Sequence, residues 1–441
     1  MKANNWKIAL FQSVRRYGIG LFFTIFVLLL SACNPVFELE INVQDQPISV
    51  LGKIAYISGG DVWVNDLDND QTTRLTQDGY NSHPFWSADG FQIAFLKKNQ
   101  LWVINSVSHQ AMLISETPVD WFAWSPKGTK LAYFISNAGL YSWSANQEAD
   151  RLLPVTTGNT LESFVWDGQE SIVYTNGSIK NGMYWLSINR LNVSNDVVET
   201  IYETSEMKEI PRLASISVDG QWISFWLWDT RITFPEQEGL LLCTMAVADK
   251  QIRCVDSRTI PSNDFIDLSS ENRIAFISTT TQENRFKNSL VIVDSPEFKE
   301  KPLVEFGTAQ RSINPAWAPD GNSIAYSGTS EIPQKPSETY KQNGIGICNR
   351  GIWVVNTESK KSRQLTDDER YCDDNPEWSA DGKYILFFRI NFNNASLWLM
   401  KSNGNDLHQV VPELTPKPEP LGEYGFINWA SWWDWWYPTT P

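Results

Sequence analysis

Beyond residue 50 the chain consists mainly of short runs in which apolar and polar residues alternate, separated by turn-forming residues. The segment 92–97, Gln-Ile-Ala-Phe-Leu-Lys, is a typical run, and the turn segment 87–90 precedes it. Alternation with a period of two places successive side chains on opposite sides of a strand, whereas an amphipathic helix has a period of 3.6 residues. Aromatic residues, which pack well on half-buried strands, form 13% of the chain and include 21 Trp. The pattern therefore predicts an all-β fold.

The runs belong to an internal repeat. Each unit has a Trp-containing strand, a tight turn that ends in Gly, a second strand and a third strand, and the clearest units add a fourth that ends in Leu-Thr. Clear copies of the Trp strand and its turn occupy 85–90, 123–128, 316–321 and 377–382, and weaker copies occupy 165–168, 217–220 and 268–271. In such a turn Asp accepts backbone N–H bonds and Gly adopts a positive φ. Four antiparallel strands per unit predict the blades of a β-propeller.

The second strands indicate the number of blades. We expect them to begin at Lys53, Gln92, Lys130, Ser171, Trp222, Arg273, Ser323 and Tyr384. Eight starts predict eight blades, with seven as the alternative if one weak unit is only an insertion. The first unit lacks a Trp strand, and the segment 426–432, Phe-Ile-Asn-Trp-Ala-Ser-Trp, has the missing pattern. We therefore expect a C-terminal strand to complete the first blade and close the ring, so that residues 51–441 form a single propeller domain.

The units resemble the TolB-type propeller repeat, in which a Trp-Ser-Pro-Asp-Gly turn is followed by an Ile-Ala-Phe strand and a trailing Arg-Leu-Thr. The resemblance covers most of residues 53–411 and is specific in the four clear units. It implies a propeller that binds proteins or serves as the non-catalytic half of a larger enzyme. Because one fold serves many functions, the resemblance does not identify the partner.

The N-terminus has the three-part layout of a secretory signal. Basic residues precede the apolar run 19–30, and two small residues lead to Cys33. The segment 30–33, Leu-Ser-Ala-Cys, resembles the lipobox of bacterial lipoproteins, which implies that a signal peptide, residues 1–32, is removed and Cys33 is acylated. Residues 33–50 would then be the lipidated cysteine and a tether. With an uncleaved anchor as the alternative, either interpretation predicts an extracytoplasmic protein held at a bacterial membrane.

The charge of the chain narrows the class of partner. The formal net charge is −15, and because the first 32 residues carry +4, the remainder carries −19. A body with this charge repels phosphate backbones, which argues against a nucleic-acid partner. Solubility is the simplest role of the charge.

Four cysteines remain after Cys33, and an even number in an exported chain permits disulfides. Cys243 and Cys254 flank an expected hairpin turn, so we expect them to lie opposite each other. By remainder, Cys348 would pair with Cys372. Buried free thiols are the alternative.

The sequence offers few candidates for chemistry. No His-Glu-x-x-His and no Gly-x-Ser-x-Gly motif is present, and we expect each of the three histidines to be structural or solvated. Asp66, Asp68 and Asp70 alternate as calcium ligands do, but the glycine and the distant Glu of a calcium loop are missing, so a solvated turn is favoured. We therefore expect no catalytic residue, no metal and no cofactor.

An aromatic cluster near the C-terminus is a candidate binding surface: Trp432, Trp433, Trp435 and Trp436. Exposed indoles could stack on a glycan or a partner. Burial in the closing strand and beneath the ring is the other interpretation, and it is favoured.

Together these features predict a non-catalytic scaffold of the cell envelope, a monomer that binds a protein or an envelope polysaccharide through one face of the ring. The longer loops, including 230–238 and 327–349, are the expected contact surface, because loops on a rigid scaffold commonly carry function. Two other interpretations stay open. A glycan hydrolase or lyase would place a pair of carboxylates in the channel, and an orphaned peptidase propeller would need a separate catalytic subunit.

Overall fold

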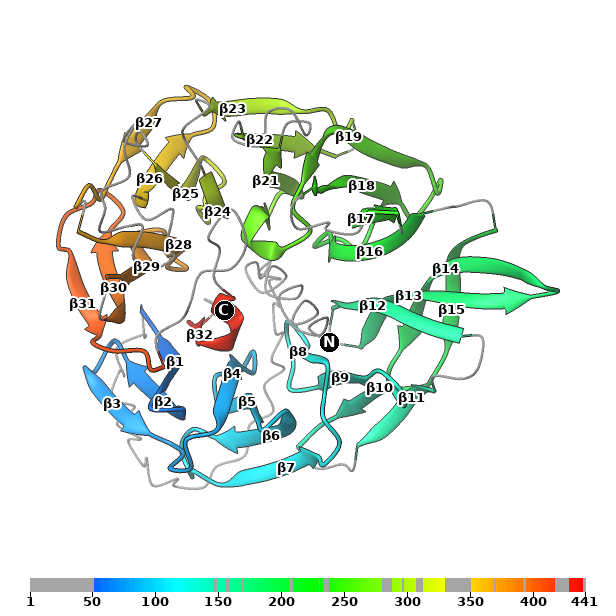
Figure 1. The fold of residues 1–441 in the computed structure, drawn as a ribbon, viewed down its shortest axis with the longest axis horizontal. Coiled ribbons are helices and arrows are strands. Elements are labelled where there is room, and N and C mark those ends of the chain that lie inside the picture. The colour runs from blue at the N-terminus through cyan, green and yellow to red at the C-terminus, as the bar shows by residue number, and fades with distance from the viewer. Residues whose placement is uncertain are drawn as a thin grey trace, which may run out of the picture.

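The computed structural model describes residues 51–438, apart from 146–148, 155–158, 169, 206–208, 230, 233–237, 280–287, 296, 307–311, 330–349, 369, 392–393 and 417–427. Its strands are arranged around a central axis in a closed ring (Figure 1). Eight blades, each of four antiparallel strands, form this ring, which confirms the all-β class and the count of eight. Two neighbouring blades share one continuous sheet because Arg258 pairs with Thr279.

From the axis outwards, the first four blades consist of β32 (Trp433–Trp436), β1 (Lys53–Ser58), β2 (Asp61–Asp66) and β3 (Gln71–Arg74); β4 (Asn81–Trp86), β5 (Gln92–Lys97), β6 (Gln100–Asn105) and β7 (Ala111–Ser115); β8 (Trp121–Trp124), β9 (Leu131–Ile135), β10 (Gly139–Trp143) and β11 (Asp150–Pro154); and β12 (Asn159–Asp167), β13 (Ser171–Lys180), β14 (Met183–Asn192) and β15 (Val198–Thr204). The other four consist of β16 (Glu209–Ile216), β17 (Trp222–Asp229), β18 (Leu240–Ala246) and β19 (Ile252–Thr259); β20 (Ile266–Leu268), β21 (Arg273–Thr279), β22 (Asn288–Asp294) and β23 (Lys301–Glu305); β24 (Ser312–Trp317), β25 (Ser323–Thr329), β26 (Arg350–Asn356) and β27 (Ser362–Gln364); and β28 (Cys372–Trp378), β29 (Tyr384–Ile390), β30 (Ala395–Lys401) and β31 (His408–Val411). Two short 3-10 turns, η3 (Asn263–Phe265) and η5 (Trp429–Ser431), lie between strands. Seven of the second strands begin at the expected residue, and β9 begins at Leu131, one residue later than expected.

The repeated Trp joins neighbouring blades. Trp124 on β8 donates its indole N–H to the carbonyl oxygen of Phe85 on β4, over 3.0 Å, and Trp166 donates to Ala123 over 2.9 Å. The same bond runs from Trp378 to Ala316 over 3.1 Å. In these three blades the Trp therefore satisfies its one donor on the preceding blade, whereas the indole N–H of the buried Trp86 has no hydrogen-bond partner in the described structure.

The turn that follows the Trp is held by its own side chains. In the second blade Ser87 Oγ donates to Asp89 Oδ1 over 2.5 Å, and the Gln92 N–H donates back to Ser87 Oγ over 3.0 Å. Gly90 completes the turn with φ +70°, a conformation that favours glycine. The local sequence therefore specifies where the first strand ends and the second begins.

The last strand closes the ring, but it begins later than the sequence pattern indicates. β32 pairs antiparallel with β1, so that Ile54 lies opposite Trp435. The expected strand, 426–432, is wrong in its described part, because Trp432 N–H donates to Trp429 O in the η5 turn. The run of tryptophans hides the alternation that would have marked the true strand.

The antiparallel order determines on which face of the ring each connection lies. Connections between first and second strands, and between third and fourth strands, lie on one face. Connections between second and third strands, and those from a fourth strand to the next blade, lie on the opposite face. The longest connections all belong to this second group: 230–239, 280–287, 330–349 and 412–432. We call the face where they leave and rejoin the ring the long-connection face. The loops expected as a contact surface, 230–238 and 327–349, start and end there, and most of their residues lie outside the described ones.

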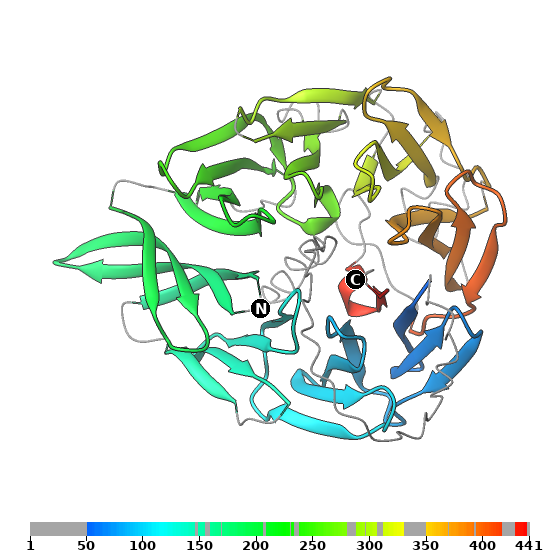
Figure 2. The same ribbon diagram turned by 180° about the vertical axis from the view of Figure 1, so that it is seen from behind.

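One blade departs from the compact outline of the ring. The hairpin of β13 and β14 extends beyond the rim, as both views show (Figures 1 and 2). Ile179, Met183 and Tyr184 near its tip are exposed. The packing between blades therefore does not require the outer end of this hairpin.

Candidate functional site

The structure places the C-terminal tryptophans in the closure of the ring. Trp433 and Trp435 are buried, and Trp432 and Trp436 are half-buried. The Trp435 indole donates to the Leu51 carbonyl over 2.6 Å, and the Trp436 indole donates to the Ala88 carbonyl over 3.0 Å. Trp433 and Trp435 therefore lack the exposed ring face that a stacking platform needs, in agreement with the interpretation that these indoles are buried.

The structure shows one of the two expected disulfides. Cys243 on β18 and Cys254 on β19 are cross-strand partners and form a disulfide with an S–S distance of 1.95 Å. Cys372 on β28 is buried and forms no disulfide with another described cysteine. Cys348 lies outside the described residues, as does Cys33, so the second pairing and the acylation site stay predictions.

The alternating aspartates organise a turn. Asp66 accepts the backbone N–H groups of Asp68 and Asn69 over 3.1 and 3.2 Å, and Asp68 accepts those of Leu51 and Gly52 over 3.1 and 2.9 Å. Within the described ranges, no group of three or more His, Cys, Asp or Glu side chains is arranged to hold a metal ion. No helix in the described part of the chain is long and apolar enough to cross a membrane.

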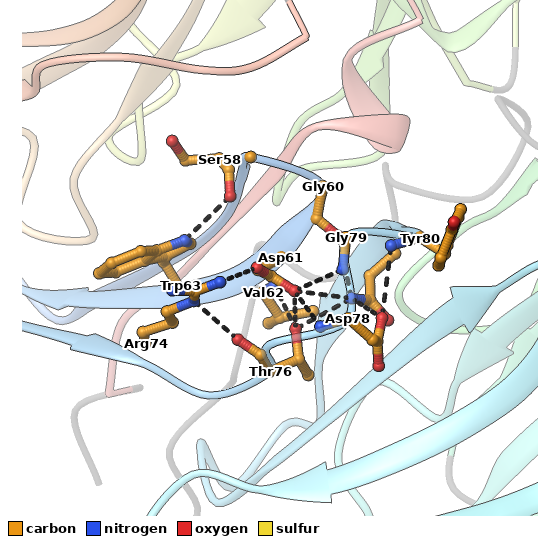
Figure 3. A network of polar contacts seen from close by, with 12 residues as sticks. Ser58, Gly60, Asp61, Val62, Trp63, Arg74, Thr76, Asp78, Gly79 and Tyr80 are labelled. Atoms are coloured by element: carbon orange, nitrogen blue, oxygen red, sulfur yellow. Dashed lines mark hydrogen bonds and ion pairs between the residues drawn. The ribbon is translucent and has the colours of Figure 1, made fainter.

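A buried carboxylate begins the third strand of the first blade. Asp61 accepts hydrogen bonds from Arg74 Nη2 over 2.5 Å, from Thr76 Oγ1 over 3.1 Å, and from the backbone N–H groups of Asp78 and Gly79, both over 2.9 Å (Figure 3). Burial alone would raise the pKa of this carboxyl, but these bonds hold the pKa below its usual value. The network fixes the connection that leads from the first blade to the second.

A buried cation begins the third strand of the seventh blade. Arg350 Nη2 lies 2.5 Å from Asp374 Oδ2 on β28, and the two side chains are 2% and 1% exposed. Burial raises the pKa of Asp374, and the Arg350 guanidinium opposes that rise. Because β28 belongs to the eighth blade, this ion pair ties two blades together.

A second buried ion pair lies beside the first. Arg389 Nε and Nη2 donate to the two carboxylate oxygens of Asp373 over 2.6 and 2.7 Å. The guanidinium also lies 4.7 Å from the ring centroids of Tyr371 and Trp398. Both charges are therefore committed to each other and to aromatic faces.

A third carboxylate near these pairs has no such cation. Asn314 Nδ2 on β24 lies 3.2 Å from Asp264 Oδ1 in η3 and 3.4 Å from Asn375 Oδ1 on β28. Burial, with a smaller contribution from the charge of Asp374, raises the pKa of Asp264 to about 7. We call Asp264, Asn314, Arg350, Asp374 and Asn375 the central cluster. It spans three blades at the long-connection ends of their inner strands.

Sequence reasoning missed the central cluster, although a signal was present. His83, Asn314 and Asn375 each precede a Pro and stand three residues before the repeat Trp. All three have a positive φ of 48–56°, and the pairing register shifts at each of them. The bulge turns these side chains away from the regular strand pattern. His83 bonds to Ser82 Oγ and to Ser431 Oγ, over 2.9 and 2.8 Å, and burial lowers its pKa to about 4.

These observations define the chain as an eight-bladed β-propeller. Its resemblances to known proteins lie in the fold alone. No family model and no curated protein sequence matches it. Dipeptidyl peptidase 4 of Porphyromonas gingivalis superimposes with a TM-score of 0.56 at 8% identity, over 83% of this chain and 59% of the peptidase.

Two further solved structures differ in function from that peptidase. A eukaryotic initiation factor superimposes with a TM-score of 0.51 at 11% identity, over 83% of this chain and 87% of that protein. TolB of Acinetobacter baumannii is also similar, at 13% identity over 86% of this chain and 66% of TolB, with a TM-score of 0.36. A peptidase and an initiation factor both superimpose on this chain, so the fold alone does not decide the function.

Proposed function

We propose that this chain is an extracytoplasmic lipoprotein, held at a bacterial membrane through Cys33, whose propeller binds a protein partner through the long-connection face without catalysis. The unequal faces of the ring carry the proposal. One face has only short turns, whereas the longest connections start and end on the other face, where the central cluster lies. A rigid ring that presents variable connections on one side is the usual design of a binding surface.

Two observations support the compartment and the absence of catalysis. The disulfide between Cys243 and Cys254 is typical of oxidising compartments outside the cytoplasm. Of the described carboxylates in and beside the central cluster, Asp373 and Asp374 are committed to arginines, and Asp267 accepts the backbone N–H of Trp317 over 2.7 Å. Glycoside hydrolysis needs two carboxylates at a defined separation, so the glycan-acting alternative has less support.

Photo-crosslinking from matched positions on the two faces tests the binding surface. Tyr80 is 61% exposed on the long-connection face, and Val107 is 68% exposed on the opposite face. A photoreactive residue at Tyr80 of the full chain should yield a discrete crosslinked protein in intact cells, and one at Val107 should not. Equal products from both positions, or a product from Val107 alone, would contradict the proposed face.

The anchor is tested separately. The full chain should incorporate labelled fatty acid and sediment with membranes, whereas the Cys33→Ala variant should lose the label. A Cys372→Ala variant is the matched control, since that thiol is buried in the ring. Label that persists in Cys33→Ala would refute acylation at this residue.

A further inference from the structure

The charges of the central cluster do not balance. Asp374 is paired with Arg350 and the neighbouring Asp373 with Arg389. Asp264 instead contacts Ser262 Oγ at 3.0 Å and Asn314 Nδ2 at 3.2 Å, and no Lys or Arg in the described ranges pairs with it. Asp264 is therefore a half-buried carboxylate that solvent can reach and that has no counter-ion in the described ranges.

A second group of the central cluster, a buried amide oxygen, lacks a hydrogen-bond donor. Asn314 is 3% exposed, and its Oδ1 has no hydrogen-bond partner in the described structure. A buried acceptor left without a donor costs roughly 1–3 kcal/mol, so such groups normally have a partner. Asn375 Oδ1, 3.4 Å from Asn314 Nδ2, adds another acceptor. At Asp264 and Asn314 the unmet demand is therefore for a group that donates hydrogen bonds and carries positive charge.

The donor set distinguishes between two kinds of cation. Ca²⁺ takes six to eight oxygen ligands, usually with several carboxylates among them. Here Asp374 has a carboxylate oxygen 2.5 Å from Arg350, and only Asp264 is without a cation. One carboxylate with two amide oxygens matches the several N–H donors of an ammonium or guanidinium group.

We propose that the central cluster binds the ammonium or guanidinium group of a Lys or Arg side chain of the partner protein. Asp264 supplies the negative charge, and the amide oxygens of Asn314 and Asn375 accept the remaining donors. The proposal rests on the proposed function, since it names the chemistry of the partner at the long-connection face. The net charge of −19 outside the first 32 residues favours the approach of a basic partner.

The test uses the full chain in detergent and two peptides, acetyl-Gly-Lys-Gly-amide and its uncharged match acetyl-Gly-norleucine-Gly-amide, titrated by ligand-observed NMR at pH 8. The lysine peptide should bind and the norleucine peptide should not. Asp264→Asn should weaken binding by about tenfold or more, because a charge-assisted bond is replaced by a neutral one. Asp229→Asn, at a half-buried acid paired with the exposed Arg231, should leave binding unchanged.

Two further readouts keep the proposal falsifiable. Asp264→Asn should raise the midpoint of urea unfolding at pH 8, because it removes an uncompensated charge, and that rise shows that the variant is folded. Asn314→Asp should tighten binding of the lysine peptide by adding a carboxylate. Binding that is equal in wild type and Asp264→Asn, no binding to the wild type, or binding of Ca²⁺ or Mn²⁺ in place of the peptide would overturn the proposal. Each of these leaves the crosslinking result from Tyr80 unaffected, so the two proposals can fail separately.

Discussion

The first and seventh blades carry buried charges of opposite sign at the start of the third strand, at neighbouring positions of the repeat. Asp61 and Arg350 each begin the third strand of their blade, opposite Ser58 and Thr329 respectively. A threonine after the fourth strand repeats as well, because Thr76 accepts the Val62 N–H and Thr366 accepts the Ile352 N–H, both over 2.9 Å. These bonds align Val62 with Ile352, so the backbone frame is shared, but Asp61 precedes its aligned residue by one position and Arg350 by two.

The partners of the two charges differ in kind. The Asp61 carboxylate is held largely by backbone N–H groups and Thr76, and its cation, Arg74, is 44% exposed. The Arg350 guanidinium faces a buried carboxylate on the next blade. A buried charge at the start of the third strand therefore stabilises a local connection in one blade and the contact between blades in the other. The turn Gly59–Gly60 accompanies the first case, and the connection 330–349 accompanies the second.

The largest effect should come from removing the two arginines in turn. Arg350→Met leaves Asp374 charged and buried without its partner, and such a loss costs about 3–5 kcal/mol of unfolding free energy. Arg74→Met removes a partly exposed partner and should cost about 0–1 kcal/mol. Urea unfolding measures both. Adding Asp374→Asn to Arg350→Met should recover much of the loss, and equal costs for the two arginines would contradict the comparison.

His83, which precedes a Pro as Asn314 and Asn375 do, should make the free energy of unfolding depend on pH. His83 has a folded pKa of about 4 and an ordinary unfolded value near 6.5, so its contribution to stability is complete above pH 6.5 and is lost as the pH falls towards 4. His83→Asn, which copies Asn314 and Asn375, should remove this loss, worth about 2–3 kcal/mol at pH 4.5.

The titration of Asp264 changes the stability in the opposite direction over an overlapping pH range. Its raised pKa makes its charge destabilising above pH 7, and this penalty falls as the pH drops through 7 towards 4. The measurement must therefore be the difference between wild type and His83→Asn across the pH range. A constant difference from pH 7 to 4.5 would show that His83 does not titrate in this way.

A moderate effect should follow when Asp61 is made neutral. Asp61→Asn keeps an acceptor for the backbone N–H groups but loses the charge, so we expect a cost of about 1–2 kcal/mol. The exposed pair of Asp368 and Arg370 supplies the control, since Asp368→Asn there should cost under about 0.5 kcal/mol. A cost at Asp61 no greater than that at Asp368 would show that its network contributes little.

The smallest effect should separate the two threonines. Thr366→Val removes the acceptor of one backbone bond and a side-chain bond to Asp373, and should cost about 1 kcal/mol. Thr76→Val should cost a few tenths of a kcal/mol more, because Thr76 donates to Asp61 over 3.1 Å and in addition accepts from Asn81 Nδ2 over 2.9 Å. Unfolding of the two single variants and of Asp61→Asn/Thr76→Val tests whether the excess depends on the carboxylate.

The fold could be predicted from the sequence because its signals are local. The turn of Ser87, Asp89 and Gly90 and the period-two strand that follows are encoded within a few residues. The closing strand was misplaced because its pairing with β1 is a contact between the two ends of the ring, which a local pattern does not contain. The pairing of Cys243 with Cys254 could be predicted because both residues lie on one hairpin, so their contact is local.

The central cluster could not be predicted because it is assembled from three blades. Asp264 and Asn314 are 50 positions apart, and Asn314 and Asn375 are 61 apart. The repeated Asn-Pro pair marks each position, but only the closed ring brings them together. The burial that raises the pKa of Asp264 is likewise a property of the assembled blades.

The pairing of β32 with β1 also bears on biogenesis. A chain synthesised from its N-terminus contains β1 first and β32 last, so an edge from Lys53 to Tyr56 stays unpaired until the last strand is made. Unpaired edges recruit other strands. A truncated product that lacks β32 would keep that edge permanently, and the ring would thereby distinguish complete from incomplete copies.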